Sequence, residues 1–104
     1  MKCRVEITET CLLLIESIPD KRIQKVILSR VDSLRADPAK RGKPLVKDLA
    51  GFRSMHAAKR YRILYRIDEE SNVVWAVAAG IRKEGDQKDI YEVARRLLRL
   101  GLLQ

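Results

Sequence analysis

The 104-residue sequence has the length of one domain, with 46% hydrophobic and 35% charged residues. Apolar residues at this frequency and regular spacing exclude a disordered chain. Twenty-two Lys and Arg against 14 Asp and Glu give a formal net charge of +8 at pH 7, which favours a polyanionic partner such as nucleic acid or a strongly acidic protein. We expect a single domain over residues 1–104 with one modest core.

Membrane, export and metal signals are absent from the sequence. No apolar run approaches the roughly 18 residues of a membrane helix, and the N-terminal MKCRVEITE carries acids where a signal peptide would be apolar. We therefore expect a cytoplasmic protein without a membrane partner. Cys3 and Cys11 form no CxxC pair and the chain has one His, so we expect buried thiols, no metal and no cofactor.

The first third of the chain predicts a strand followed by two helices. Residues 2–7 alternate apolar and charged side chains, as in a half-buried strand. Thr8 is placed to cap a helix that ends at Pro19, and Asp20 to cap a second helix that ends before Asp37. Together the two helices form a hairpin.

The rest of the chain predicts three strands and a helix. A basic loop at residues 39–44 leads to strands at residues 52–58, 60–68 and 73–81, the last almost continuously apolar as in a strand covered on both faces. Asp89 and Glu92 are spaced to form a capping box for a final helix. The expected fold is α+β, in the order β-α-α-β-β-β-α. Its small antiparallel sheet carries the N-terminal helical hairpin and the C-terminal helix.

Arginine placement is the most informative feature. Alternation along residues 60–68 puts Tyr61 and Tyr65 on the core face and Arg60, Arg62 and Arg66 on the other. A face with three arginines is not a core face, because an unpaired buried guanidinium is too costly. It is either a solvated face paired with nearby acids or a concave basic surface that holds a phosphate backbone. Because acids are fewer than bases here, we favour the second interpretation.

Further basic residues extend this candidate phosphate-binding set at strand ends and in loops. They are Arg53, Lys59, Arg82, Lys83 and Lys88.

Two further side chains determine what chemistry such a surface performs. Histidine is the residue type whose unperturbed pKa lies closest to neutrality, and the expected strand places His56 on the face of Phe52 and Ser54. A lone histidine is more often structural than catalytic, so both roles stay open. Tyr91, in the first turn of the last helix, either packs, stacks on a base or transfers a proton. Trp75, within an apolar strand, is assigned to the core.

The motifs of other hydrolytic and phosphate-binding sites are missing. The chain has no Gly-x-Ser-x-Gly, no glycine-rich phosphate loop and no paired carboxylates for glycosidic chemistry. If the chain is an enzyme, positive charge must stabilise its transition state.

Three segments resemble the RelE/ParE superfamily of bacterial toxins from type II toxin–antitoxin modules, most closely its RelE-type members. They are LVKDLAGFRS at residues 45–54, RYRILYRID at residues 60–68 and GIRKEGDQKDIY at residues 80–91. The resemblance covers nearly the whole chain. It implies a cytoplasmic endoribonuclease that cleaves mRNA on the ribosome without a cofactor. In that mechanism the substrate 2′-OH attacks the adjacent phosphorus, and the reaction inhibits translation.

The resemblance also assigns roles to individual residues. It makes Arg62 the ligand of the scissile phosphate, and Arg82 the residue that stabilises transition-state charge or protonates the leaving oxygen. Tyr91 stacks on a base or assists proton transfer, and His56 is a candidate base for the 2′-OH. RelE-like enzymes carry closely spaced lysines on the strand that here bears Arg53 and His56. The loop before Tyr91 is longer than in the compact enzymes, so the alternative is that Tyr91 stops short of the site.

Two other functions stay open beside the nuclease. One is a ParE-like toxin that inhibits DNA gyrase without nuclease chemistry, and the other is a degenerate basic module that binds RNA without cleaving it. All three share an expected protein partner, a cognate antitoxin that folds over the basic surface. The apolar stretch at residues 97–103 either forms part of that docking surface or completes the toxin core.

Overall fold

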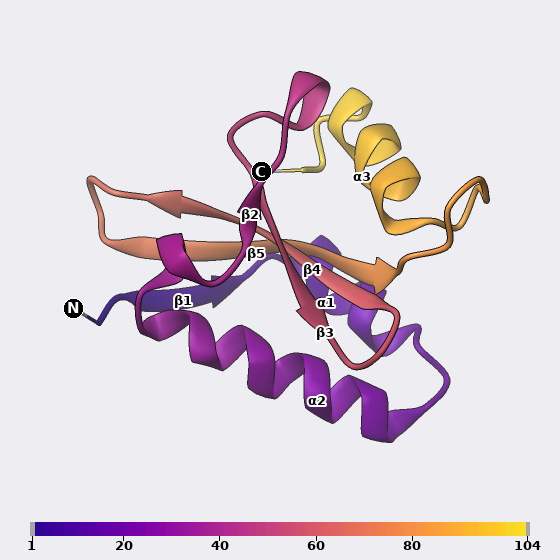
Figure 1. Ribbon diagram of the computed structural model, residues 1–104, viewed down its shortest axis with the longest axis horizontal. Helices are drawn as coiled ribbons and strands as arrows, with labels where there is room; N and C mark the ends of the chain where they lie inside the picture. The colour runs from indigo at the N-terminus through magenta and orange to yellow at the C-terminus, as the bar shows by residue number, and fades with distance from the viewer. Residues whose placement is uncertain (1, 104) are drawn as a thin grey trace.

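The computed structural model describes residues 2–103 and shows a mixed sheet with helices on both faces (Figure 1). The strand order is β1-β5-β4-β3-β2. The α+β class is confirmed. The helices are α1 (Glu9–Glu16), α2 (Lys21–Asp32) and α3 (Ile90–Arg99), and the strands are β1 (Arg4–Ile7), β2 (Lys43–Pro44), β3 (Arg53–Ala57), β4 (Tyr61–Asp68) and β5 (Val73–Ile81).

The three consecutive strands β3, β4 and β5 pair antiparallel, as expected from their short connections. The edges of the sheet differ from the all-antiparallel prediction. β1 pairs in parallel with β5, and the two-residue β2 pairs with β3. β5 is therefore an interior strand between β1 and β4, which explains its continuous apolar sequence.

The caps of the first two helices match the sequence prediction. The Thr8 hydroxyl accepts from the Cys11 N–H at 3.1 Å, and the Asp20 carboxylate accepts from the Arg22 N–H at 2.9 Å. α2 ends earlier than predicted, at Asp32, and a short 3₁₀ helix at Ser33–Arg35 follows it.

One face of the sheet is buried under α1 and α2. Ile15 and Ile27 from these helices pack with Ile63 and Tyr65 of β4, all almost fully buried. The Cys11 thiol lies in the same cluster, where burial raises its pKa to about 12, so it is inert as a nucleophile.

Within residues 2–103, no helix is both long and apolar enough to cross a bilayer.

The opposite face carries a second core, which corrects the expectation of an open basic surface. α3 packs Ile90 and Ala94 against Leu64 of β4 and Val77 of β5. A β-bulge at Leu64/Tyr65 shifts the register, so consecutive β5 residues both join this cluster. α3 therefore covers part of the arginine face.

The sequence assigned Trp75 to the core and left the burial of residues 97–103 open, and the structure gives the burial of both. Trp75 is half-buried, with the Arg66 guanidinium 5.7 Å from its ring centroid, and is not fully in the core. At the C-terminus Leu103 is buried in the second core, whereas Leu100 and Leu102 are exposed. The 97–103 stretch thus completes the core through some residues and leaves others uncovered.

The basic loop between α2 and β2 is fixed by hydrogen bonds from the sheet. The Tyr65 hydroxyl donates to the Pro38 carbonyl at 2.7 Å, and Arg53 Nη2 donates to the carbonyls of Ala39 at 2.7 Å and Gly42 at 2.6 Å. Buried or half-buried donors on rigid strands leave the loop little freedom.

Gly42 lies so close to the sheet that only glycine fits. A Cβ at this position would lie 2.5 Å from the Ser54 carbonyl oxygen and 2.8 Å from the Tyr65 hydroxyl. We therefore expect Gly42→Ala to lower the free energy of unfolding by about 1–3 kcal/mol, because backbone or a buried ring must shift. Urea denaturation checks this, and an unchanged midpoint would show that the loop does not pack as described.

Candidate active site

A groove of about 600 Å³ lies along β2 and β3, between the basic loop that precedes β2 and the start of α3. His56, Arg62 and Tyr91 all line it. Three of the four residues predicted to be catalytic are thus brought together from β3, β4 and the first turn of α3.

His56 and Arg62 face the groove as cross-strand partners. They are paired in the β3–β4 register, which places their Cβ atoms about 4.5–5.5 Å apart. The predicted face of His56 is consistent with the packing, since Phe52 joins the α3 core while Met55 joins the opposite core. The His56 side chain is exposed, and Arg62 is half-buried with Nη1 donating to the Tyr61 carbonyl at 3.2 Å. Both present polar groups to a ligand in the groove.

Tyr91 reaches the groove despite the long loop before it. Its hydroxyl lies 2.7 Å from the Ser54 hydroxyl, and Ser54 is buried on β3 two residues from His56. This hydrogen bond fixes the phenol beside the histidine. Sequence reasoning placed Ser54 on the correct face but gave it no role, because an unremarkable serine in a strand carries no signal of its own.

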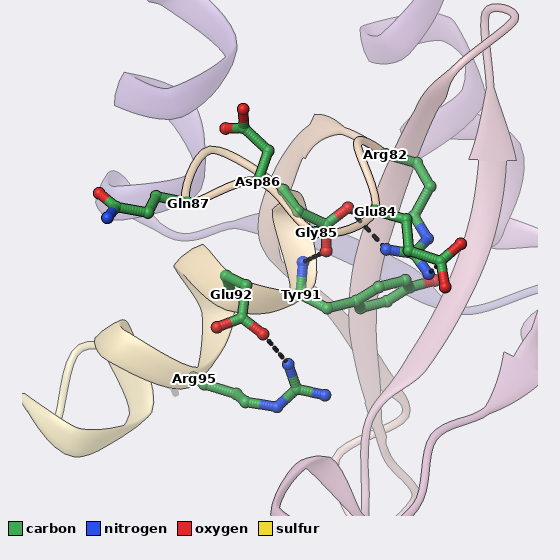
Figure 2. A pocket seen from close by; sticks show the side chains of 9 residues that line it. Arg82, Glu84, Gly85, Asp86, Gln87, Tyr91, Glu92 and Arg95 are labelled. Atoms are coloured by element: carbon green, nitrogen blue, oxygen red, sulfur yellow. Dashed lines mark hydrogen bonds and ion pairs between the residues drawn. The ribbon is translucent and has the colours of Figure 1, made fainter.

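Arg82 lies against Tyr91 but borders an adjoining pocket of about 420 Å³ (Figure 2). Its guanidinium carbon is 4.9 Å from the Tyr91 ring centroid, a cation–π contact. Nη1 donates to Asp89 Oδ1 at 2.7 Å, and Nη2 lies 3.9 Å from a Glu84 oxygen. The hydrogen bond to Asp89 raises the pKa of Arg82 above its already high ordinary value. Arg82 therefore stays cationic, which favours charge stabilisation over proton donation.

Asp89 anchors this arrangement from a buried position, with only 2% of its surface exposed. Besides the bond from Arg82, its carboxylate accepts from the backbone N–H of Lys83 at 2.7 Å and of Tyr91 at 3.1 Å. Burial alone would raise the pKa of Asp89, but the hydrogen bonds from Arg82 and Lys83 outweigh it and hold the pKa below its ordinary value. Asp89 thus orders the arginine, the loop and the helix start together.

The predicted capping box is only half correct. Asp89 caps α3, but Glu92 does not return a bond to it. The Glu92 carboxylate instead accepts from Arg95 at 2.6 Å (Figure 2). The Asp89 N–H donates to the Asp86 carbonyl at 3.1 Å.

Four further cations line the groove that sequence reasoning did not select: Arg30, Lys40, Arg41 and Lys43. Arg30 donates from Nε and Nη2 to the His56 carbonyl, at 3.3 Å each. Within residues 2–103, neither these four nor Arg62 forms an ion pair. The basic run AKRGKP at residues 39–44 was the sequence signal for Lys40, Arg41 and Lys43. Arg30 had no such signal, because it is one of several polar residues on a helix.

Other predicted phosphate ligands lie away from the groove. Arg53 points to the opposite face of β3 and binds loop carbonyls. Lys59 and Arg60 lie in the β3–β4 turn, and Arg60 precedes β4 although it was predicted within that strand. Lys83 pairs with Asp86 at 3.4 Å. Lys88 lines a separate pocket between α1 and α3.

Comparison with known proteins identifies the family of the chain. Residues 6–85 match the model of the ParE toxin of the type II toxin–antitoxin system, parDE. The chain belongs to the RelE/ParE superfamily of toxins. The matched span includes His56, Arg62 and Arg82 and ends before Asp89 and Tyr91.

Comparisons of sequence and of structure both find similar toxin–antitoxin proteins from Mycobacterium tuberculosis. Toxin RelG is 34% identical over 74 residues, which cover 71% of this chain and 84% of RelG. The structure of the toxin–antitoxin complex RelBE2 contains a chain that is 31% identical, with a TM-score of 0.71, over 79% of this toxin and all of that chain. The free Escherichia coli RelE variant is 15% identical with a TM-score of 0.65, over 93% of this chain and 99% of that one, and shows a shared fold alone.

Proposed function

We propose that the toxin is an endoribonuclease that cleaves mRNA in the ribosomal A site and so inhibits translation. The observation that carries this proposal is one groove in which an exposed histidine, an arginine and a tyrosine phenol converge among cations that form no ion pair within residues 2–103. Such a groove attracts a phosphate chain and holds side chains that transfer protons. The nuclease reaction needs no cofactor, because the substrate supplies its own nucleophile.

The proposed reaction divides its steps among three side chains. His56 takes the proton of the substrate 2′-OH as this oxygen attacks the adjacent phosphorus. Arg62 donates hydrogen bonds to the non-bridging oxygens, whose negative charge grows in the transition state. The P–O5′ bond breaks, and the Tyr91 phenol gives its proton to the departing 5′ oxygen. The products are a 2′,3′-cyclic phosphate and a 5′-OH end.

Arg82 has a supporting role in this proposal. It remains positively charged beside the Tyr91 ring and stabilises negative charge that develops near the phenol. The Asp89 carboxylate neutralises part of the positive charge of Arg82 but holds its guanidinium in one position.

We further propose that the toxin is paired with an antitoxin, as the RelBE2 toxin is in its complex. A net charge of +8 favours an acidic partner segment.

Gyrase inhibition is the second candidate. It is favoured by the matching family model, which describes a ParE toxin, and by β3, whose sequence RSMHA lacks closely spaced lysines. Gyrase inhibition would leave mRNA intact.

His56→Ala provides the sharpest test of the nuclease. The side chain is exposed and makes no hydrogen bond within residues 2–103, so the variant should fold normally. We expect cleavage to fall by about 10²–10⁴-fold, the usual contribution of a general base. The measurement is primer extension on mRNA within minutes of inducing each protein in bacteria. A purified translation reaction, run with and without ribosomes, tests ribosome dependence.

The outcomes separate the three functions. New 5′-OH ends inside reading frames that disappear with His56→Ala support the nuclease. Intact mRNA with growth arrest and DNA damage would indicate gyrase inhibition instead. Intact mRNA with normal growth would leave a basic RNA-binding module.

A further inference from the structure

A further, smaller pocket of about 360 Å³ shares lining residues with the groove. It is lined by Arg30, Asp37, Lys40 and Arg41, so all its lining residues are charged. Three cations face one acid, and none of the four forms an ion pair within residues 2–103. The pocket therefore holds uncompensated positive charge.

The pocket is held in place by the surrounding backbone. Arg53 donates to the carbonyls of Ala39 and Gly42, on either side of the two loop cations. Arg41 Nε donates to the Ala36 carbonyl at 2.9 Å. Because the loop is fixed before any ligand arrives, little ordering entropy is lost on binding.

The same cations connect this pocket to the groove. Arg30, Lys40 and Arg41 line both. Arg30 also donates to the His56 carbonyl, so it lies between the charged pocket and the proposed general base. An extended phosphate chain in the groove would pass directly over the pocket.

We propose that Arg30, Lys40 and Arg41 form a second phosphate subsite, which binds a backbone phosphate of the RNA strand next to the scissile one. The subsite rests on the proposed function for its ligand. Arg53, assigned at first to the phosphate itself, acts as a positioning residue that holds the loop bearing Lys40 and Arg41.

The lining favours an RNA phosphate over the apolar face of an antitoxin helix. A docked helix gains most of its affinity by inserting apolar anchors into an apolar groove. This pocket is lined by charged residues only, whereas a phosphate needs cations and N–H donors.

The test measures how salt weakens binding of an uncleavable 2′-O-methyl RNA of eight nucleotides. Single-stranded nucleic acids lose about 0.7 in the slope of log affinity against log salt for each phosphate contact removed. Lys40→Gln combined with Arg41→Gln should therefore lower the slope by about 0.7, which is about a 2.6-fold smaller loss of affinity between about 50 and 200 mM salt. Lys40→Gln alone should lower the slope in the same direction by a smaller amount, because Arg41 and Arg30 remain at the phosphate. Lys40 makes no side-chain hydrogen bond within residues 2–103, so this variant keeps the test valid if the double variant misfolds.

The control removes the same charge elsewhere on α2. Lys21 and Lys25 are exposed and lie 180° and 140° around the helix from Arg30 at about 100° per residue, so Lys21→Gln with Lys25→Gln should leave the slope unchanged. A second control is a 2′-O-methyl dinucleotide, titrated by NMR. It carries only the phosphate between its two nucleosides, and the loop variants should not weaken its binding.

Each outcome distinguishes the subsite from the nuclease. Unchanged slopes in both loop variants would overturn the subsite even if wild-type toxin cleaves mRNA. Equal slope losses in the α2 control would overturn it too, because overall charge would then explain binding. If the slopes change as expected in a protein that cleaves nothing, the subsite stands and the nuclease proposal fails.

Discussion

Asp89→Ala is expected to lower the free energy of unfolding by about 3 kcal/mol, the largest stability effect we predict for one side chain. Removing one partner of a buried ion pair costs about 3–5 kcal/mol, and the lower end applies because the Arg82 side chain is 31% exposed and can regain water. The backbone N–H groups of Lys83 and Tyr91 lose their acceptor at the same time. Chemical denaturation measures the loss.

A matched control lies in the same loop. Asp86 also accepts a backbone N–H, from Lys88 at 2.7 Å, and pairs with Lys83, but its side chain is 34% exposed. Asp86→Ala should destabilise the toxin far less than Asp89→Ala. Equal losses from the two variants would contradict the anchoring role of Asp89.

Acid stability gives an independent readout of Asp89. Its folded pKa lies below the ordinary value of 3.8, so its contribution to stability is complete above that pH and is lost as pH falls through the folded pKa. Asp89→Asn should therefore weaken the dependence of stability on pH below about 3.8. Some dependence should remain, because the pKa values of Asp20 and Asp68 are also lowered by hydrogen bonds. An unchanged acid profile would show that Asp89 is not ionised and bonded as described.

Local patterns predicted the elements of this fold well. Alternation located β4, and short polar side chains located the starts of all three helices, because both signals act between residues close in sequence. The parallel pairing of β1 with β5 joins segments about 70 residues apart, and no local pattern encodes it. The second core was missed for a related reason. Leu64 is the apolar residue between the two arginines of β4, and it is buried because α3 packs over that face of the sheet.

The site was predicted in part, and the failures share a cause. Residue type and face identified His56 and Arg62, since both depend only on strand alternation. Arg53 lies on the same strand as His56, and alternation correctly places it on the opposite face. It was assigned to the phosphate by residue type, but it binds loop carbonyls there. Arg30 joins the groove from a helix that packs on the far face of the sheet, which requires knowledge of how α2 crosses the edge of β3. A basic composition thus predicts a polyanion partner but not which cations meet it.

Arg62→Gln is expected to reduce mRNA cleavage by about 10²–10³-fold. This is the largest effect on activity that we predict for a residue other than His56 and Tyr91, which transfer the protons. Arg62 is the groove arginine paired in register with His56, so it is placed to meet the scissile phosphate. Glutamine keeps a hydrogen-bond donor but removes the charge that offsets the extra negative charge of the transition state. Single-turnover cleavage of a ribosome-bound message measures the loss.

Arg66→Gln is the control that assigns this loss to position and not to charge. Arg66 lies on the same strand as Arg62 but contacts Trp75 and does not line the groove. Both variants lower the net charge by one, so long-range attraction of RNA changes equally. Arg66→Gln should therefore retain most of the cleavage rate. If the two variants lose activity together, β4 acts as a general basic surface and Arg62 has no special place at the phosphate. If only Arg62→Gln loses mRNA cleavage, the reaction takes place in the strip between β3 and α3. The second core leaves this part of the arginine face uncovered.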